Sequence, residues 1–164
     1  MPILPVQIIW LNFITDGFLD VSLAMEGKEK NLLSEQFRKP NKYLIDFSMA
    51  TRMFFMAIVM MIGALFIFKG LFQTDLAKAQ TMSLVVLAIF QWFNAWNCKS
   101  EDKSVFIINP FANKFLVGAT ITIILLQLFA IYSPFMQKIL QTTPISGYDW
   151  LLCILVASSI LLVE

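Results

Sequence analysis

Five long apolar stretches alternate with short polar segments along the chain. They cover roughly residues 3–25, 44–68, 82–98, 115–136 and 148–163. Each is close to the length of about 17 to 25 residues that a helix needs to cross the hydrocarbon core of a bilayer. The pattern predicts an all-α fold, an integral membrane helical bundle of about five transmembrane helices.

Basic residues are distributed unequally between the polar segments. If the N-terminus lies outside the cell, nine of the 12 basic residues face the cytoplasm, and only Lys69, Lys78 and Lys138 face outward. Cytoplasmic loops of membrane proteins carry such an excess of Lys and Arg. We therefore expect a multi-pass membrane protein, located in the plasma membrane, with its N-terminus outside and its C-terminus in the cytoplasm.

The composition excludes several classes of function. The chain is 59% hydrophobic and 14% charged, with a net charge of +1, which is not the balance of a nucleic-acid-binding protein. Its expected partner is the lipid bilayer. The absence of histidine excludes His-ligated metal sites and catalysis by Ser-His or Cys-His pairs. Cys98 and Cys153 lack CxxC spacing, and we expect small packed residues rather than a disulfide or a metal pair.

The first apolar stretch carries polar residues at its centre, in the sequence LNFITDGFLD. An aspartate at the centre of a transmembrane helix costs about 2.5 to 3.5 kcal/mol, so an interaction must offset the burial of Asp16 and Asp20. Asn12, Asp16 and Asp20 follow the helical spacing i, i+4, i+8, and Thr15 lies beside them. These oxygen ligands suit a hard cation such as Ca²⁺, Mg²⁺, Na⁺ or H⁺. A hydrogen-bonded seam between helices is the alternative.

Other polar residues interrupt the later stretches. Gln91, Asn94 and Cys98 follow the spacing i, i+3, i+7, with Asn97 nearby, and the Gln91 amide oxygen is a candidate ligand for the same ion. A glutamine that only packs helices is the alternative. Five further polar residues are predicted to form hydrogen bonds between helices. They are Thr120, Thr122, Gln127, Ser158 and Ser159.

At these motifs the chain resembles the P-type cation-transporting ATPases, in the branch that contains the calcium pumps. PVQIIWLNFITDG is similar to the sixth transmembrane helix of that family, with the core W-x-N-x-x-T-D-G. AQTMSLVVLAIFQWFNAWNCKS is similar to the eighth helix, and NPFANKFLVG to the start of the ninth. The resemblance implies that residues 1–164 form the C-terminal transmembrane domain of a pump, helices six to ten.

The resemblance also implies roles for individual residues. Asn12, Thr15 and Asp16 match the positions that coordinate the transported ion, for which Ca²⁺ is favoured. Gln91 occupies a position at which pumps with two calcium sites carry a glutamate, which implies one ion per cycle here. The calcium pumps usually carry Pro-Ala where this chain has Leu19 and Asp20. Asp20 is therefore expected to line the path of the ion rather than to bind it.

Several motifs of the family are absent from this chain, namely the DKTGT phosphorylation motif, the TGE motif, the nucleotide domain and the fourth-helix glutamate. The chain alone is therefore expected not to hydrolyse ATP, and to be a fragment. In an intact pump, an ATP-driven cation translocase that uses ATP and Mg²⁺, its partners would be the remaining domains and helices. The alternatives are a stand-alone interaction or regulatory protein derived from a pump tail, and a passive cation conduit.

Overall fold

The structure, a computed structural model, describes residues 1–25, 47–98 and 113–162. These residues form helices and no strand, so the predicted all-α fold is confirmed. The first helix, Pro5–Ala24, consists of α1 (Pro5–Trp10), a π-helical segment (Leu11–Asp16) and α2 (Gly17–Ala24). The other helices are α3 (Phe47–Leu71), α4 (Leu76–Asn97), α5 (Lys114–Tyr132), α6 (Pro134–Leu140) and α7 (Gly147–Ala157), which continues as a 3₁₀ segment (Ser158–Leu162).

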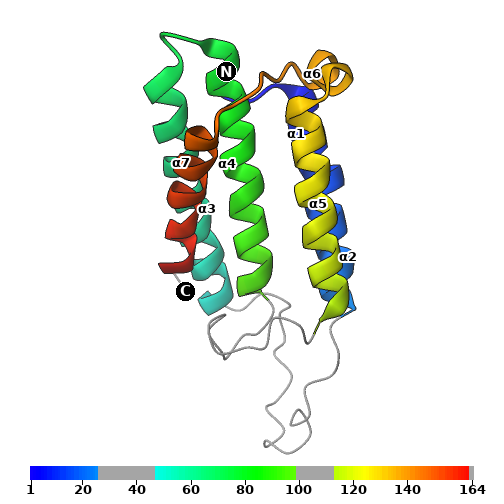
Figure 1. The fold of residues 1–164 in the computed structure, drawn as a ribbon. Coiled ribbons are helices and arrows are strands. Elements are labelled where there is room, and N and C mark those ends of the chain that lie inside the picture. Colours follow the sequence, from blue (N-terminus) through cyan, green and yellow to red (C-terminus); the bar gives the residue numbers. More distant parts are fainter. Residues whose placement is uncertain (26–46, 99–112, 163–164) are drawn as a thin grey trace, which may run out of the picture.

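Helix α4 lies at the centre of the bundle (Figure 1). It packs against α3 and α7 on one side and against the π segment, α2 and α5 on the other. Of its 22 residues, 14 are buried, among them Met82, Leu84 and Phe90. The first helix runs along α5. The polar motifs of the first helix and of α4 therefore lie on neighbouring elements.

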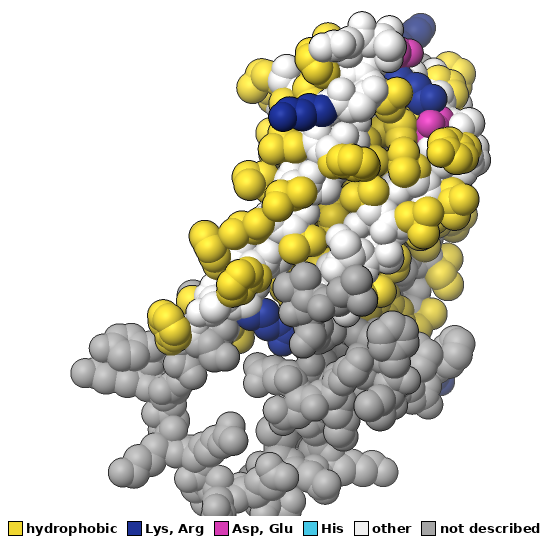
Figure 2. Space-filling view, turned by 90° about the vertical axis from the view of Figure 1, so that its left-hand side faces the viewer, with side chains coloured by type: hydrophobic (Ala, Val, Ile, Leu, Met, Phe, Trp, Pro, Cys, Tyr) yellow, Lys and Arg dark blue, Asp and Glu magenta, His cyan; other side chains and the backbone are white. Residues whose placement is uncertain are grey.

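Four helices of the described residues are long and apolar enough to cross a membrane. They are Pro5–Ala24, Met49–Leu71, Leu76–Asn97 and Lys114–Tyr132, and a shorter apolar helix covers Gly147–Leu161. The outer face of α3 exposes large apolar side chains, including Phe54, Phe55 and Phe66. Figure 2 shows one face of the molecule on which hydrophobic side chains dominate. Such a surface must be covered by lipid or by further helices. The chain is a multi-pass membrane protein, and the predicted number of crossings stays a prediction.

At Gly63, helix α3 approaches α4 and α7 closely. A Cβ atom placed on it would lie 2.7 Å from Cζ of Phe90 in α4 and 3.0 Å from Cγ1 of Val156 in α7. Both neighbours belong to the main hydrophobic core or pack against it. The missing side chain of Gly63 is what lets α3 pack this tightly against α4 and α7.

The fourth apolar stretch divides into two helices. α5 ends at Tyr132, because Ser133 is extended (φ −78°, ψ 125°), as a residue before a proline usually is. Pro134 then begins α6 at the first helical position, where its missing N–H costs nothing. The predicted stretch 115–136 is thus one helix up to Tyr132 and the start of a second helix at a new angle.

Four of the five predicted interhelical hydrogen bonds are wrong. The hydroxyls of Thr120 and Thr122 donate to carbonyls four residues back in α5, and those of Ser158 and Ser159 donate to carbonyls three residues back. Hydroxyl side chains in helices can donate their hydrogen bond to a carbonyl of the preceding turn in this way. Gln127 alone bonds to another helix, through Trp10. Neither Cys98 nor Cys153 forms a disulfide within the described residues. Cys153 is buried, but Cys98 is exposed rather than packed.

Candidate cation site

The polar motif of the first helix coincides with its π-helical segment. The six residues LNFITD, Leu11–Asp16, are π-helical, and the Gly17 N–H donates to the Asn12 carbonyl five residues back. Gly17 itself is right-handed helical (φ −56°, ψ −43°), so the helix continues through it into α2. π segments are rare and occur often at functional sites, where they change the direction of side chains.

The structure places the four predicted polar residues of the first helix partly inside and partly outside the bundle. Thr15 is fully buried, and its Oγ1 has no hydrogen-bond partner among the described residues. Asp16 is half-buried. Asn12 and Asp20 are exposed, on a side of the helix that no described helix covers. The three side chains Asn12, Asp16 and Asp20 thus lie toward the open side, and Thr15 is turned into the bundle.

Helix α4 contributes a second set of unpartnered polar atoms. Gln91 Oε1 and Asn94 Oδ1 are buried without a hydrogen bond among the described residues, and so are both polar atoms of Asn97. A buried polar atom left without a partner costs about 1 to 3 kcal/mol, so native proteins usually supply water or an ion at such places. Because α4 packs directly on the π segment, the helices that carry Gln91 and Thr15 are neighbours.

The candidate ligands of the first helix and of α4 offer mostly neutral oxygen atoms and few carboxylates. Among the described residues there is no group of three or more His, Cys, Asp or Glu side chains that could hold a metal ion. Asp16 and Asp20 are the two carboxylates of the first helix. A selective calcium site uses 6 to 8 oxygens, which exceeds what Asn12, Thr15, Asp16 and Gln91 offer. The arrangement can therefore supply part of a cation site, and the other ligands would come from elsewhere.

Two glutamines hold the first half of the helix in place. The buried Gln7 donates from Nε2 to the carbonyl of Leu140 at the end of α6, at 2.9 Å. Trp10 Nε1 donates to Oε1 of Gln127 in α5, at 3.0 Å. Gln7 was not among the predicted functional residues, although a glutamine inside an otherwise apolar run is itself an indication of a buried partner.

Asn113 holds the other end of the helix. Its Nδ2 donates to the carbonyl of Ser22 in α2 at 3.0 Å, and its Oδ1 accepts from the N–H of Leu116 as the N-cap of α5. Asn113 belongs to the string NPFANKFLVG, whose first four residues lie outside the described ranges. No role was predicted for Asn113, though an asparagine directly before an apolar run is a typical helix start.

Comparison with known proteins places these features in a family. The family model for the C-terminus of cation-transporting ATPases matches residues 1–164. The chain is 32% identical over 158 residues to a calcium-transporting ATPase of Bacillus subtilis, which covers 94% of this chain. It is 32% identical to the calcium-transporting ATPase type 2C member 2 of the mouse and 31% identical to calcium-transporting ATPase 1 of Saccharomyces cerevisiae, each covering 99% of this chain. It spans 18% of the length of each of these relatives.

Proposed function

Because this chain belongs to the cation-transporting ATPases, whose C-terminal membrane region it matches along its whole length, we propose that it forms the membrane half of an ATP-driven calcium pump. In this role it supplies part of the intramembrane cation site and of the transport path. The ligands come from the π segment and α4. They are Asn12, Thr15, Asp16 and Gln91, with Asp20 on the path of the ion.

One observation carries this proposal. Thr15 Oγ1 and Gln91 Oε1 are buried without partners on two elements that pack against each other. Both atoms are oxygens, which are the ligands that Ca²⁺ prefers, so both are suited to contact a bound cation. The names of the relatives support calcium as the cation. The remaining ligands, like the phosphorylation chemistry that uses ATP and Mg²⁺, would come from the rest of the pump.

The exposed side of the first helix supports a role within a larger assembly. Asn12 and Asp20 are exposed on a helix whose sequence is otherwise suited to a bilayer. Contact of Asp20 with lipid would be costly, so this side would face further helices of the pump or a hydrated path. We propose that these helices belong to the part of the relatives that this chain does not span.

The arrangement of the helix ends supports the proposed orientation. Met1, the turn between α3 and α4, and α6 lie at the same end of the bundle (Figure 1). Lys69, Lys78 and Lys138 occur in these parts of the chain, which would face outward. Most of the basic residues that would face the cytoplasm lie outside the described residues. The plasma membrane remains the proposed location.

The proposal is tested by ATP-dependent ⁴⁵Ca²⁺ uptake into membrane vesicles that contain the full-length protein. We expect Asp16→Asn to abolish uptake or to raise the calcium concentration needed for half-maximal uptake at least ten-fold, because it removes the carboxylate of the proposed ligand set. Asp75→Asn is the matched control. Asp75 caps α4 through the N–H of Lys78, and asparagine caps as well as aspartate. Unchanged calcium dependence in Asp16→Asn would refute the site.

A further inference from the structure

Buried polar side-chain atoms without a partner gather at the C-terminal end of α4. In the part of the chain that the structure describes, most such atoms belong to Gln91, Trp92, Asn94 and Asn97, which all lie in the last two turns of this helix. Buried polar groups in native proteins nearly always have a partner, so such a concentration indicates a place that a ligand or water completes. The proposed function uses only Gln91 of these four residues.

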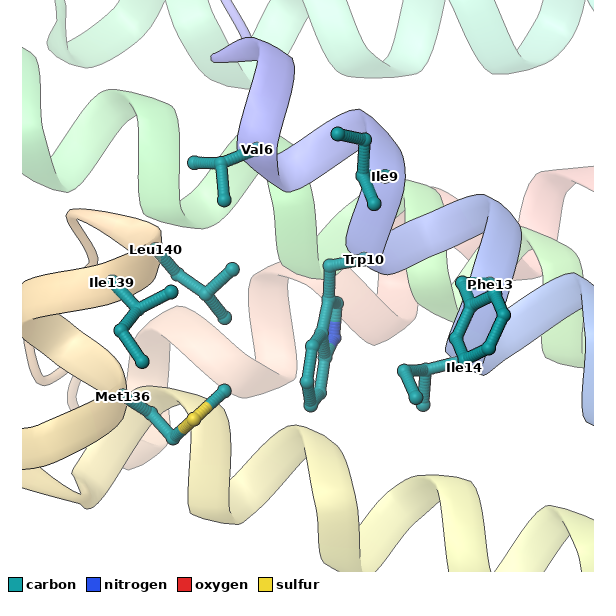
Figure 3. Close-up of a pocket in the computed structure, with 8 residues that line it drawn as sticks. All are labelled: Val6, Ile9, Trp10, Phe13, Ile14, Met136, Ile139 and Leu140. Atoms are coloured by element: carbon teal, nitrogen blue, oxygen red, sulfur yellow. The ribbon is translucent and has the colours of Figure 1, made fainter.

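The side of the first helix that faces α6 offers no ligand for a cation. An apolar groove lies there, lined by Phe13 and Ile14 among others (Figure 3). All the described residues that line it are apolar, and Nε1 of Trp10 already donates to Gln127. The oxygen ligands that could join Thr15 at one ion are therefore expected on α4, which packs against the π segment.

The four residues of α4 differ in the atom that lacks a partner. Trp92 offers only an N–H group, which is a donor and does not bind a cation. At Asn97 the amide oxygen and the amide nitrogen are both buried without partners, whereas at Gln91 and Asn94 this holds for the oxygen alone. Asn94 therefore has the same arrangement as the proposed ligand Gln91, with its acceptor turned inward.

Asn94 also lies on the same side of α4 as Gln91. Nε2 of Gln80 donates to the carbonyl of Met1 at 2.9 Å, so this side of α4 faces the start of the chain. Successive residues of a helix are about 100° apart, which places Gln91 about 20° from Gln80 and Asn94 about 40° from it in the other direction. Asn97 is about 120° from Gln91 and lies on a different face.

The spacing of the two oxygens suits a single ion. Gln91 and Asn94 are three residues apart, so their Cβ atoms are separated by about 5 to 6 Å. Oxygen ligands lie about 2.3 to 2.6 Å from Ca²⁺, so two ligands of one ion are up to about 5 Å apart. The first helix and α4 run in the same direction (Figure 1), and α4 packs against both the π segment and α2. Asn94 is thus displaced from Gln91 in the direction in which Asp20 is displaced from Asp16.

We propose that Oδ1 of Asn94 is a further ligand of the transported cation, one helical turn beyond Gln91 on the side of Asp20. The inference rests on the proposed function, because it concerns the same ion. Asn94 adds an oxygen to a ligand set that falls short of the 6 to 8 oxygens of a selective calcium site. As a neutral ligand, it completes the coordination without adding a charge inside the membrane.

The experiment compares three variants of the full-length protein by ATP-dependent ⁴⁵Ca²⁺ uptake. Asn94→Leu removes the oxygen and should raise the calcium concentration for half-maximal uptake at least about ten-fold, because even groups that only support a metal ligand cost about that much when removed. Asn94→Asp keeps an oxygen there and should need no more calcium than the parent. Asn97→Leu is the matched control, since it removes a buried amide from another face of α4, and should leave the calcium dependence unchanged. Equal effects of Asn94→Leu and Asn97→Leu would overturn the proposal.

A second measurement separates a ligand from a packing residue. Calcium raises the unfolding midpoint of a protein that binds it in the folded state. In detergent, Asn94→Leu should unfold without calcium no earlier than the parent, because it loses an unsatisfied oxygen, but calcium should raise its midpoint less. A lower calcium-free midpoint with the full calcium effect would show a packing role and overturn the proposal. If Asn94→Leu does not fold, Asn94→Asp decides, because calcium should then stabilise it at least as much as the parent.

Asp16→Asn, measured beside these variants, distinguishes this inference from the proposed function. If Asp16→Asn and Asn94→Leu both leave the calcium dependence unchanged, the proposed function fails and the inference fails with it. If only Asp16→Asn raises the calcium requirement, the cation site stands and Asn94 is not one of its ligands.

Discussion

The indole Nε1 of Trp10 donates a hydrogen bond to Oε1 of Gln127 at 3.0 Å, across 117 residues of sequence. It joins the first helix to α5 immediately before the π segment begins. Gln127 is 1% exposed, and its Nε2 has no partner among the described residues, so the bond to Trp10 is the hydrogen bond that the structure gives its amide group. This partly buried bond and the bond from Asn113 to the carbonyl of Ser22 thus hold the first helix against α5.

Trp10→Phe is therefore expected to destabilise the bundle by about 0.6 to 1.7 kcal/mol, which are the average and the largest values measured for hydrogen bonds between transmembrane helices. The measurement is the midpoint of unfolding in detergent. Trp150→Phe is the matched control. Trp150 Nε1 donates to the exposed hydroxyl of Tyr132 at 3.0 Å, so water can replace that bond. Equal effects of the two substitutions would contradict the role assigned to the bond between Trp10 and Gln127.

Gly63→Ala is expected to destabilise the protein by about 1 to 3 kcal/mol, although alanine normally favours a helix over glycine. The new Cβ would lie 2.7 Å and 2.8 Å from two ring atoms of Phe90, which is fully buried and has little room to move. Gly118→Ala, in α5, has no atom within 4 Å of its Cβ and should be neutral or stabilising. Adding Phe90→Leu to Gly63→Ala should relieve the clash and recover part of the stability relative to Phe90→Leu alone.

Asn113 performs two tasks that one substitution can separate. Asn113→Asp keeps the acceptor that caps α5 but loses the donor to the carbonyl of Ser22, whereas Asn113→Ala loses both. We expect the alanine variant to be about 1 kcal/mol less stable than the aspartate variant, which is the usual value of an N-cap. Hydrogen exchange of the first turn of α5 measures the cap directly. If both variants protect that turn equally, the cap is not what Asn113 supplies.

Apolar patterning predicted the helices because backbone N–H and C=O groups inside a bilayer must bond to one another, and a helix achieves this within one segment. The helix pair α5 and α6 shows where this argument stops. Hydropathy continues past Tyr132 to Met136, and only the proline at 134 indicates that the helix ends. The π segment was not foreseen either, because residue types do not reveal whether an N–H bonds four or five residues back.

The candidate site could be predicted by residue type but not by orientation. The spacing predicted Asn12, Asp16 and Asp20 on one side of the helix, and in the structure Asn12 and Asp20 are exposed and Asp16 is half-buried. It could not show that Thr15, beside Asp16, is fully buried in the bundle. The sequence also could not show which hydroxyls bond to another helix, because a threonine such as Thr120 can bond to its own helix instead.

Thr15→Val gives the sharpest test of whether the buried hydroxyl of Thr15 binds the ion or stabilises the fold. Valine has nearly the shape of threonine, and Oγ1 of Thr15 has no partner among the described residues, so removing it takes away an unsatisfied polar group. We expect the ion-free protein to be unchanged or up to about 1 to 3 kcal/mol more stable. If Thr15 is a ligand, half-maximal calcium uptake by the full-length protein should nevertheless require a higher calcium concentration.

Thr15→Ser completes this test, because it keeps the hydroxyl and removes the methyl group from a buried position. It should lose about 1 kcal/mol of stability through the lost burial and the cavity, while the calcium dependence of uptake stays close to that of the parent. The two variants thus move stability and calcium dependence in opposite ways. If the hydroxyl only joined helices, Thr15→Val would give a less stable protein whose calcium dependence is unchanged. Thr15 would then not be a ligand.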